Sequence, residues 1–348
     1  GLIDNYAIYQ DILTTSKETH NYTLTSWIDE SYILPIKNET TTSKQTNEET
    51  YKFKVKVVGV DTPITIEEKS NVTTGVDTLI ALTNNKDSSG LYTITHPADN
   101  TLQIGNDKDI TEYRYRGASP KNYVTFNNEV WRILGVFPTD DGTGNIENRI
   151  KIIKDQSIGD KYWNTNGSNN WARPATLNTE LNTTYLNSLD STAQTMIETA
   201  KYYLGGYKSS LITSVDMYNY ERKISGSSYY YGSNPNSWTG KLGLMYASDY
   251  GYASDVCETK ALYNSSSSND LRACNTTNWL YNIKVHEWLL PQYAGNSDGA
   301  FDVDAVGYAS GYSVGNYQFV VRPVLYLTSS TKITGGTGTS TDPYTLGL

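Results

Sequence analysis

The sequence has few positive charges and no long apolar run, and both absences exclude classes of function. Its 28 Lys and Arg residues are outnumbered by 37 Asp and Glu residues, which gives a net charge of −9, and they form no basic block. Nucleic-acid binding depends on a positive patch that neutralises phosphates, so no nucleic-acid partner is expected. No apolar stretch approaches the roughly 20 residues that a transmembrane helix needs. Membrane attachment is therefore expected only through an anchor outside this chain.

Cysteine is also scarce, since the chain contains only Cys257 and Cys274. They lie in a Ser/Asn-rich segment and form no CxxC pair, which disfavours a metal site. Two interpretations stay open, a disulfide that closes a surface loop or two buried free thiols. A disulfide would indicate an oxidising compartment. The chain also begins at Gly1 without an initiator Met, as a processed or trimmed ectodomain would.

Tyrosine, in contrast, is abundant. The chain contains 30 Tyr, whereas charged residues make up only 19% of it. A tyrosine ring supplies apolar area with a polar tip, which suits exposed sheets and binding surfaces. Aromatic residues amount to 12% of the chain, which argues against disorder. We therefore predict a folded protein with a tyrosine-rich surface.

The first 73 residues show the alternation that is typical of half-buried β-strands. Segments 22–32 and 51–61 both have apolar side chains at every second position. A polar loop separates them, and segment 62–75 has the composition of a linker. We predict a small, possibly partial, β-sandwich over residues 1–73.

Residues 74–348 combine strand patterns with helical ones, which predicts an α+β domain. A hairpin is predicted where Asn127-Asn128 separates two apolar strands. Apolar residues at every fourth position predict a helix over 175–189, and a second helix, capped by Ser191, is predicted over 190–206. Later strands are predicted over 242–249, 286–291, 299–306, 316–328 and 343–348.

The order of these segments resembles a known family. The segments "NEVWRILGVF", the helix pair, "GLMYASDYGY", "EWLLP" and "RPVLYL" follow one another as in the C-type-lectin fold of the formylglycine-generating-enzyme-like branch. That fold also occurs in secreted surface proteins of gut Firmicutes and in the variable proteins of diversity-generating retroelements. The resemblance covers about residues 74–348. It implies a C-type lectin fold preceded by the small β-sandwich.

The resemblance also implies where a ligand would bind. In the variable proteins, the residues just ahead of the final Arg-Pro-containing strand are the ones that vary, and this segment corresponds to 296–321 here. Its Tyr, Ser, Gly and Asn residues resemble an antibody paratope. The alternative is a polar loop that binds nothing. The predicted ligand-binding residues are Asn296, Asp298, Asp302, Asp304, Tyr308, Ser310, Tyr312, Asn316, Tyr317 and Gln318.

Four residues in and beside this segment carry separate expectations. Asp302 and Asp304 alternate with apolar residues, so both carboxylates are expected to point away from the apolar face. They would either contact a ligand or form a solvated strand face. Arg322 precedes a core strand and is expected to pair with a buried carboxylate. His286 is expected to be structural rather than a metal ligand.

Neither activity of the resembled fold has its motif in this chain. The calcium-dependent sugar motifs EPN, QPD and WND are absent, and Cys257 and Cys274 do not match the closely spaced cysteine pair of formylglycine-generating enzymes. We therefore predict no enzyme activity, no catalytic residue, no metal and no cofactor.

Taken with the resemblance, these patterns predict a secreted or cell-surface bacterial protein that binds a ligand. Binding would use a Tyr/Asp/Ser-rich surface that a retroelement diversifies. The partner would be a protein or glycan on another cell or on a phage or host surface. Two alternatives stay open, namely a structural pilus or cell-wall subunit without a diversified site, and an enzyme of the formylglycine-generating type.

Overall fold

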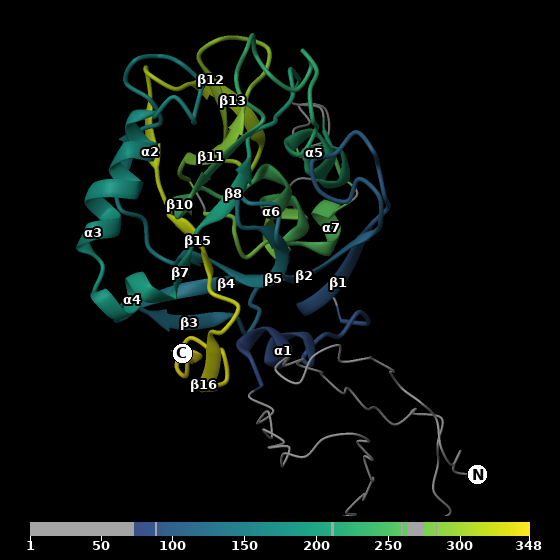
Figure 1. The fold of residues 1–348 in the computed structure, drawn as a ribbon, viewed down its shortest axis with the longest axis vertical. Coiled ribbons are helices and arrows are strands. Elements are labelled where there is room, and N and C mark those ends of the chain that lie inside the picture. The colour runs from purple at the N-terminus through teal and green to yellow at the C-terminus, as the bar shows by residue number, and fades with distance from the viewer. Residues whose placement is uncertain (1–72, 88, 210–211, 259, 263–273, 283) are drawn as a thin grey trace, which may run out of the picture. The chain divides into compact units, whose positions relative to one another are not determined.

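The computed structural model describes residues 73–348, except residues 88, 210–211, 259, 263–273 and 283 (Figure 1). The β-sandwich predicted for residues 1–73 lies, up to residue 72, outside the described residues. The described part mixes helices with strands, and strands dominate. The α+β class predicted for residues 74–348 is therefore confirmed.

The larger of the two main sheets contains eight strands, and all its pairings are antiparallel. Its order is β1-β2-β4-β5-β15-β10, with β3 on β4 and β7 on β15. The inner strand β15 is buried throughout, and β5 is buried from Arg149 to Lys154. The strands are β1 (Gly90–His96), β2 (Ile110–Arg116), β3 (Tyr123–Phe126), β4 (Glu129–Asp140), β5 (Ile146–Lys154), β7 (Ile197–Glu198), β10 (Leu242–Gly243) and β15 (Val324–Leu327).

The second sheet contains five strands in the order β13-β12-β11-β14-β6. Its pairings are antiparallel except for β11 with β14, which run parallel. The strands predicted at 286–291 and 299–306 appear here as β11 and β12. The strands are β6 (Asp160–Tyr162), β11 (Glu287–Gln292), β12 (Gly299–Val303), β13 (Ala309–Ser313) and β14 (Gln318–Val320).

Short helices and two small two-stranded sheets, β8-β9 and β16-β17, complete the described fold (Figure 1). The helix predicted over 175–189 is confirmed as the continuous run α2-η1-α3, and its Leu177, Leu181 and Leu189 are buried. The remaining elements are α1 (Gly75–Ile80), α2 (Thr176–Glu180), η1 (Leu181–Tyr185), α3 (Leu186–Ser188), α4 (Ser191–Met196), α5 (Ser214–Glu221), α6 (Ala247–Tyr252), α7 (Asp255–Glu258), β8 (Ala200–Tyr203), β9 (Ser237–Gly240), β16 (Lys332–Gly335) and β17 (Thr345–Gly347).

The β3–β4 hairpin turns at the predicted position. Asn127 and Asn128 have φ values of 54° and 57°, in the left-handed region that asparagine tolerates better than most residues. Phe126 pairs with Glu129 across this two-residue turn. Two consecutive positive φ values match the twist of the flanking strands, which explains why asparagine is favoured at both positions.

The second predicted helix, over 190–206, is wrong beyond its first turns. Helix α4 ends at Met196, and the chain continues as β7 and β8. The helix is capped by Asp190, whose side chain accepts a bond from the Ala193 N–H, and not by Ser191. Strand partners decide the outcome, because β7 pairs with β15 and β8 pairs with β9. Tertiary pairing thus overrides a weak helical pattern.

The strand predicted over 242–249 is mostly wrong as well. Only Leu242 and Gly243 form a strand, and the chain then enters α6. The Asp249 carboxylate accepts a hydrogen bond from the Tyr246 N–H at 2.9 Å, which satisfies a free donor at the start of this helix. Asp249 thus caps the N-terminus of α6.

The Asp249 carboxylate also joins α6 to the main sheet through buried charges. Arg114 on β2 donates to its Oδ1 at 2.8 Å, and Lys151 on β5 donates to its Oδ2 at 2.5 Å. These three side chains are at most 3% exposed. Burial by itself would raise the pKa of Asp249, but Lys151 and Arg114 lower it below its ordinary value. The stabilisation by this carboxylate is therefore present at neutral pH and is lost as the pH falls through the lowered pKa.

A second buried ion pair fixes the place where the chain passes from β14 to β15. Arg322 donates from Nε and Nη2 to the two Glu287 oxygens at 2.7 and 2.8 Å, and Nη2 also reaches the Leu280 carbonyl at 2.9 Å. The buried partner predicted for Arg322 is confirmed. The single strand predicted over 316–328 is interrupted here, because Pro323 has no N–H for a sheet hydrogen bond.

Removing this carboxylate should be costly. We expect Glu287→Ala to lower the free energy of unfolding by about 3–5 kcal/mol, because it leaves Arg322 buried without a counterion. Chemical denaturation of the variant and the wild type measures the difference.

The control is Glu180→Ala, which breaks a pair with Lys161 of 2.7 Å between half-exposed side chains. That pair should contribute less than about 1 kcal/mol because water screens it. Similar losses in the two variants would contradict a special contribution from the buried pair.

Candidate functional site

One face of the second sheet carries an aromatic cluster. The register places Trp288 opposite Asp302 and Asp302 opposite Ser310, so these three side chains share a face. Because side chains two residues apart on a strand share a face, His286 and Tyr312 belong to it as well. Phe319 on β14 completes it, with ring centroids 4.6 Å from His286 and 4.5 Å from Trp288. We use the term aromatic face for His286, Trp288, Tyr312, Tyr317 and Phe319.

The aromatic face has a buried layer and an exposed layer. Trp288 and Phe319 are only 1% and 8% exposed, whereas Tyr317 is 48% exposed. The Tyr317 ring stacks on Phe319 at 5.7 Å and meets the Tyr312 ring edge-on at 5.5 Å. Tyr312 and His286 are half-buried. The rings open to solvent therefore rest on a packed aromatic base, which restricts their motion.

A buried carboxylate lies beneath this face. Asp302 has no exposed surface; its Oδ2 lies 2.7 Å from His286 Nδ1, and its Oδ1 accepts from Ser310 Oγ at 3.2 Å. Burial raises the pKa of Asp302 to about 6. The hydrogen bond to Asp302 raises the pKa of His286 above its ordinary value. The bond from Asp302 to Nδ1 thus fixes the orientation of this half-buried ring.

The structure separates the predicted ligand-binding residues into groups. Tyr312 and Tyr317 lie on the aromatic face, with Asp302 and Ser310 beneath it. Asp304 and Tyr308 belong to the turn between β12 and β13. Residues at the opposite end of this hairpin and in the segment from β13 to β14 make up the rest, namely Asn296, Asp298, Asn316 and Gln318.

The expectation that Asp302 would point to solvent is wrong. Every residue of β12 is buried. The Asp302 side chain contacts the side chains of His286 and Ser310 instead of water. Apolar alternation identifies which side chains share a face, but it does not reveal that the second face is covered too. Asp302 therefore holds His286 in place in this structure.

The other two aspartates of the predicted set support the hairpin that carries the site. Asp304 Oδ1 accepts bonds of 2.9 Å from the N–H groups of Val306 and Tyr308, which closes the turn. Asp298 Oδ2 accepts from Ser313 Oγ at 3.0 Å at the other end. Both carboxylates keep part of their surface exposed, so ligand contact remains compatible with these structural bonds.

His286, Trp288 and Phe319 were absent from the predicted binding set. The alternation in "HEWLLP" places His286 and Trp288 on one face of a strand, so the sequence contains a signal for both residues. The sequence contains no such signal for the contact of Phe319 with His286 and Trp288, because that contact depends on the parallel pairing of β14 with β11. Parallel partners are far apart in sequence and leave no local turn signal.

The two cysteines form a disulfide, so the alternative of two free thiols is wrong. In the part of the chain that the structure describes, no three His, Cys, Asp or Glu side chains are grouped so that they could hold a metal ion. Over the same residues, no helix is both long and apolar enough to cross a membrane.

Comparisons with known proteins assign no family to this arrangement. No family model matches the chain, and neither the curated proteins nor the solved structures contain a significant match.

The His286–Asp302 pair can be tested by histidine titration. The chain contains three histidines, His20, His96 and His286, so their NMR signals can be resolved individually. We expect His286 to titrate above its ordinary pKa and Asp302→Asn to lower that value, because the amide removes the negative partner. The raised pKa of His286 adds stability that is lost as the pH rises through that pKa, and the charged pair exists only above the Asp302 pKa of about 6.

His96 provides an internal reference for the same titration. Burial lowers its pKa below the ordinary value, and Asp302→Asn should leave its titration unchanged. A His286 pKa that does not respond to Asp302→Asn would contradict the assignment of Asp302 as its positioning residue.

Proposed function

We propose that this chain is a secreted or cell-surface bacterial ligand-binding protein whose binding surface is the aromatic face with the β12–β13 turn. Binding is by contact with the tyrosine rings and the His286 ring, and it requires no cofactor. The observation that carries the proposal is the layered arrangement itself. Tyr317, 48% exposed, rests on Phe319, which is 8% exposed, beside a histidine that Asp302 orients.

Such an arrangement has the physical properties of a recognition site. Tyrosine and histidine rings that are held by packing lose little conformational entropy when a ligand binds. Tyrosine is also enriched at binding interfaces, because it combines apolar area with a hydroxyl. Exposed apolar patches with polar residues around them are typical of interaction sites in soluble proteins.

The proposed scaffold is a C-type lectin fold of the kind used by retroelement-diversified proteins. The segments that carry the resemblance form β4, β10 with α6, β11 and β15, whereas the second helix of the expected pair ends at Met196. Burial then narrows the proposed variable positions. Phe301, Asp302, Phe319 and Val320 are buried and belong to the framework. The proposed variable residues are Asn296, Asp298, Asp304, Tyr308, Tyr312, Asn316, Tyr317 and Gln318.

Sequencing this gene and its downstream flank in several isolates tests the diversification. We expect amino-acid changes to concentrate at the proposed variable residues and to spare Asp302, Phe319 and Arg322. A near-copy of the 296–321 coding segment beside a reverse-transcriptase gene is also expected. Changes spread evenly over the chain, with no such copy, would contradict diversification and favour the structural pilus or cell-wall subunit.

Binding itself can be tested with a panel of immobilised glycans and purified cell-surface proteins. For any panel member that binds the wild type, we expect Tyr317→Ala to weaken binding at least about tenfold, as loss of a central aromatic contact does. The control is Tyr231→Ala, because Tyr231 is similarly exposed, at 42%, but lies outside the aromatic face. Unchanged binding by Tyr317→Ala would contradict the proposed surface.

A further inference from the structure

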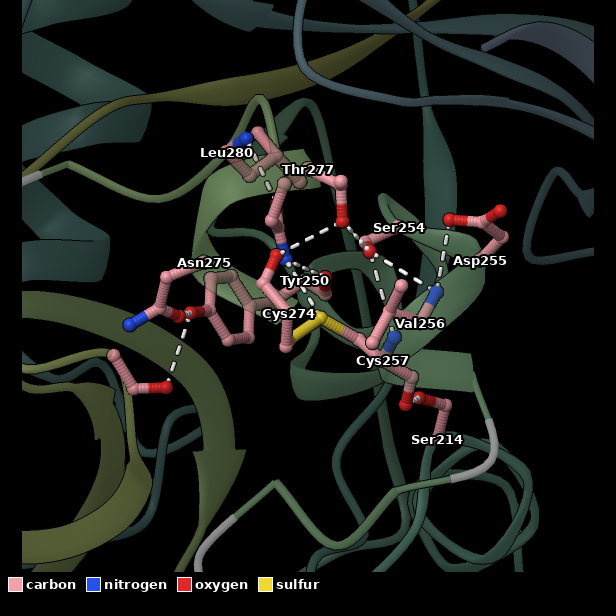
Figure 2. Close-up of a disulfide and its surroundings, with 12 residues drawn as sticks. Ser214, Tyr250, Ser254, Asp255, Val256, Cys257, Cys274, Asn275, Thr277 and Leu280 are labelled. Carbon is pink, nitrogen blue, oxygen red and sulfur yellow. Dashed lines mark hydrogen bonds between the residues drawn. A yellow bond between two sulfur atoms is a disulfide. The ribbon is translucent and has the colours of Figure 1, made fainter. Parts of the chain in front are cut away.

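The Cys257–Cys274 disulfide lies in the interior and is surrounded by hydrogen bonds (Figure 2). The two cysteines are 0% and 3% exposed and pack with Leu262 and Ala309 in one small apolar cluster. Asn278 Nδ2 lies 3.5 Å from Cys257 Sγ, and Ser214 Oγ donates to the Cys257 carbonyl at 3.2 Å. The disulfide is thus part of a packed core, and one member of that core, Ala309, begins β13.

The residues next to Cys274 bind the turn between β12 and β13. Asn275 Nδ2 donates to the Val306 carbonyl at 2.6 Å. Tyr250 Oη donates to the Gly307 carbonyl at 3.0 Å and lies 3.2 Å from Asn275 Oδ1 (Figure 2). Gly307 has a φ of 92°, and a Cβ there would come within 2.3 Å of Asn275 Oδ1. The turn and Asn275 therefore fit each other closely, at a position where only glycine is tolerated.

A residue inside the disulfide loop binds the same hairpin. The Ala309 N–H donates to the Leu262 carbonyl at 2.9 Å, and the Leu262 N–H donates to the Ile212 carbonyl at 2.8 Å. Leu262 follows Cys257 in the chain and precedes Cys274. The start of β13 is consequently held by backbone bonds that depend on where the disulfide places this loop.

We propose that the Cys257–Cys274 disulfide is a positioning element of the binding surface, which holds the turn from Asp304 to Ala309 through Leu262 and Asn275. Two residues of the proposed surface, Asp304 and Tyr308, lie in this turn. Without the crosslink, Leu262 and Asn275 would be free to leave the hairpin, and the turn would sample other conformations. The crosslink thus limits the motion of the turn between β12 and β13, most of which lies outside the strand pairing of the sheet.

Amide hydrogen exchange in the full chain tests this role without any ligand. In Cys257→Ala/Cys274→Ala we expect the Ala309 amide, bonded to Leu262, to exchange at least about tenfold faster than in the wild type. The Val314 amide bonds to the Asp298 carbonyl at 2.8 Å at the other end of the same hairpin, and it should change less than about twofold. Equal changes at Ala309 and Val314, or none at Ala309, would overturn the proposal.

A second variant keeps the test decisive if the double variant fails to fold. Asn275→Ala retains the disulfide and removes the side-chain bonds of Asn275 to the Val306 carbonyl and to Tyr250 Oη. We expect the Gly307 amide, which bonds to the Asp304 carbonyl at 2.9 Å, to exchange several-fold faster while Val314 stays unchanged. A Gly307 amide that exchanges as in the wild type would overturn the proposal as well.

The link to binding rests on the proposed function, and a separate measurement distinguishes the two. With a panel member bound by the wild type, the double-cysteine variant should bind at least about tenfold more weakly. Faster Ala309 exchange with unchanged binding would leave the positioning role intact and place the ligand elsewhere. Unchanged Ala309 exchange would refute the positioning role whatever the binding result.

Discussion

The ion pair between Arg322 and Glu287 determines how the two sheets of this protein are joined. Arg322 stands where the chain leaves β14 in the second sheet and enters β15 in the main sheet, and both of its bonds to Glu287 are buried. Because a buried guanidinium without a partner is very costly, the chain can cross only where β11 supplies this carboxylate. Just before this crossing β14 pairs in parallel with β11, and that pairing brings Phe319 beneath His286 and Tyr317.

Burial separates the part of the candidate site that is fixed from the part whose side chains can change. Buried residues of the second sheet are tied by charge and packing, as Asp302 is to His286 and Ser310. Exposed residues such as Tyr317 pack on these buried residues, but about half of the Tyr317 surface is open to solvent. Side chains of the exposed layer can therefore change with little cost in stability, whereas a change at Asp302 or Arg322 removes a buried partner. A surface of this kind favours recognition, with binding specificity separated from folding.

Local sequence patterns predicted the elements whose cause is itself local. The β3–β4 hairpin follows from Asn127-Asn128, which accept positive φ values, and the first helix follows from leucines on one stripe. The patterns failed where distant partners decided the outcome. Segment 197–203 forms strands because β15 and β9 offer unpaired edges, and segment 247–252 forms a helix because Asp249 caps it while binding Lys151 and Arg114. Of the five residues of the aromatic face, the resemblance and the tyrosine-rich composition indicated Tyr312 and Tyr317, whereas His286, Trp288 and Phe319 were missed.

The sequence by itself determined the α+β class, the tyrosine-rich segment ahead of the final core strand, and the need of Arg322 for a buried carboxylate. Each of these follows from residue type and short-range spacing, which can be read from the sequence without knowledge of the fold. Only the tertiary structure decided that Asp302 is buried, that Glu287 is the partner of Arg322, and that the disulfide core lies against the β12–β13 turn. These outcomes depend on contacts between segments far apart in the chain. Pairing of distant strands and burial of both sheet faces are properties of the packed whole, and no local pattern encodes them.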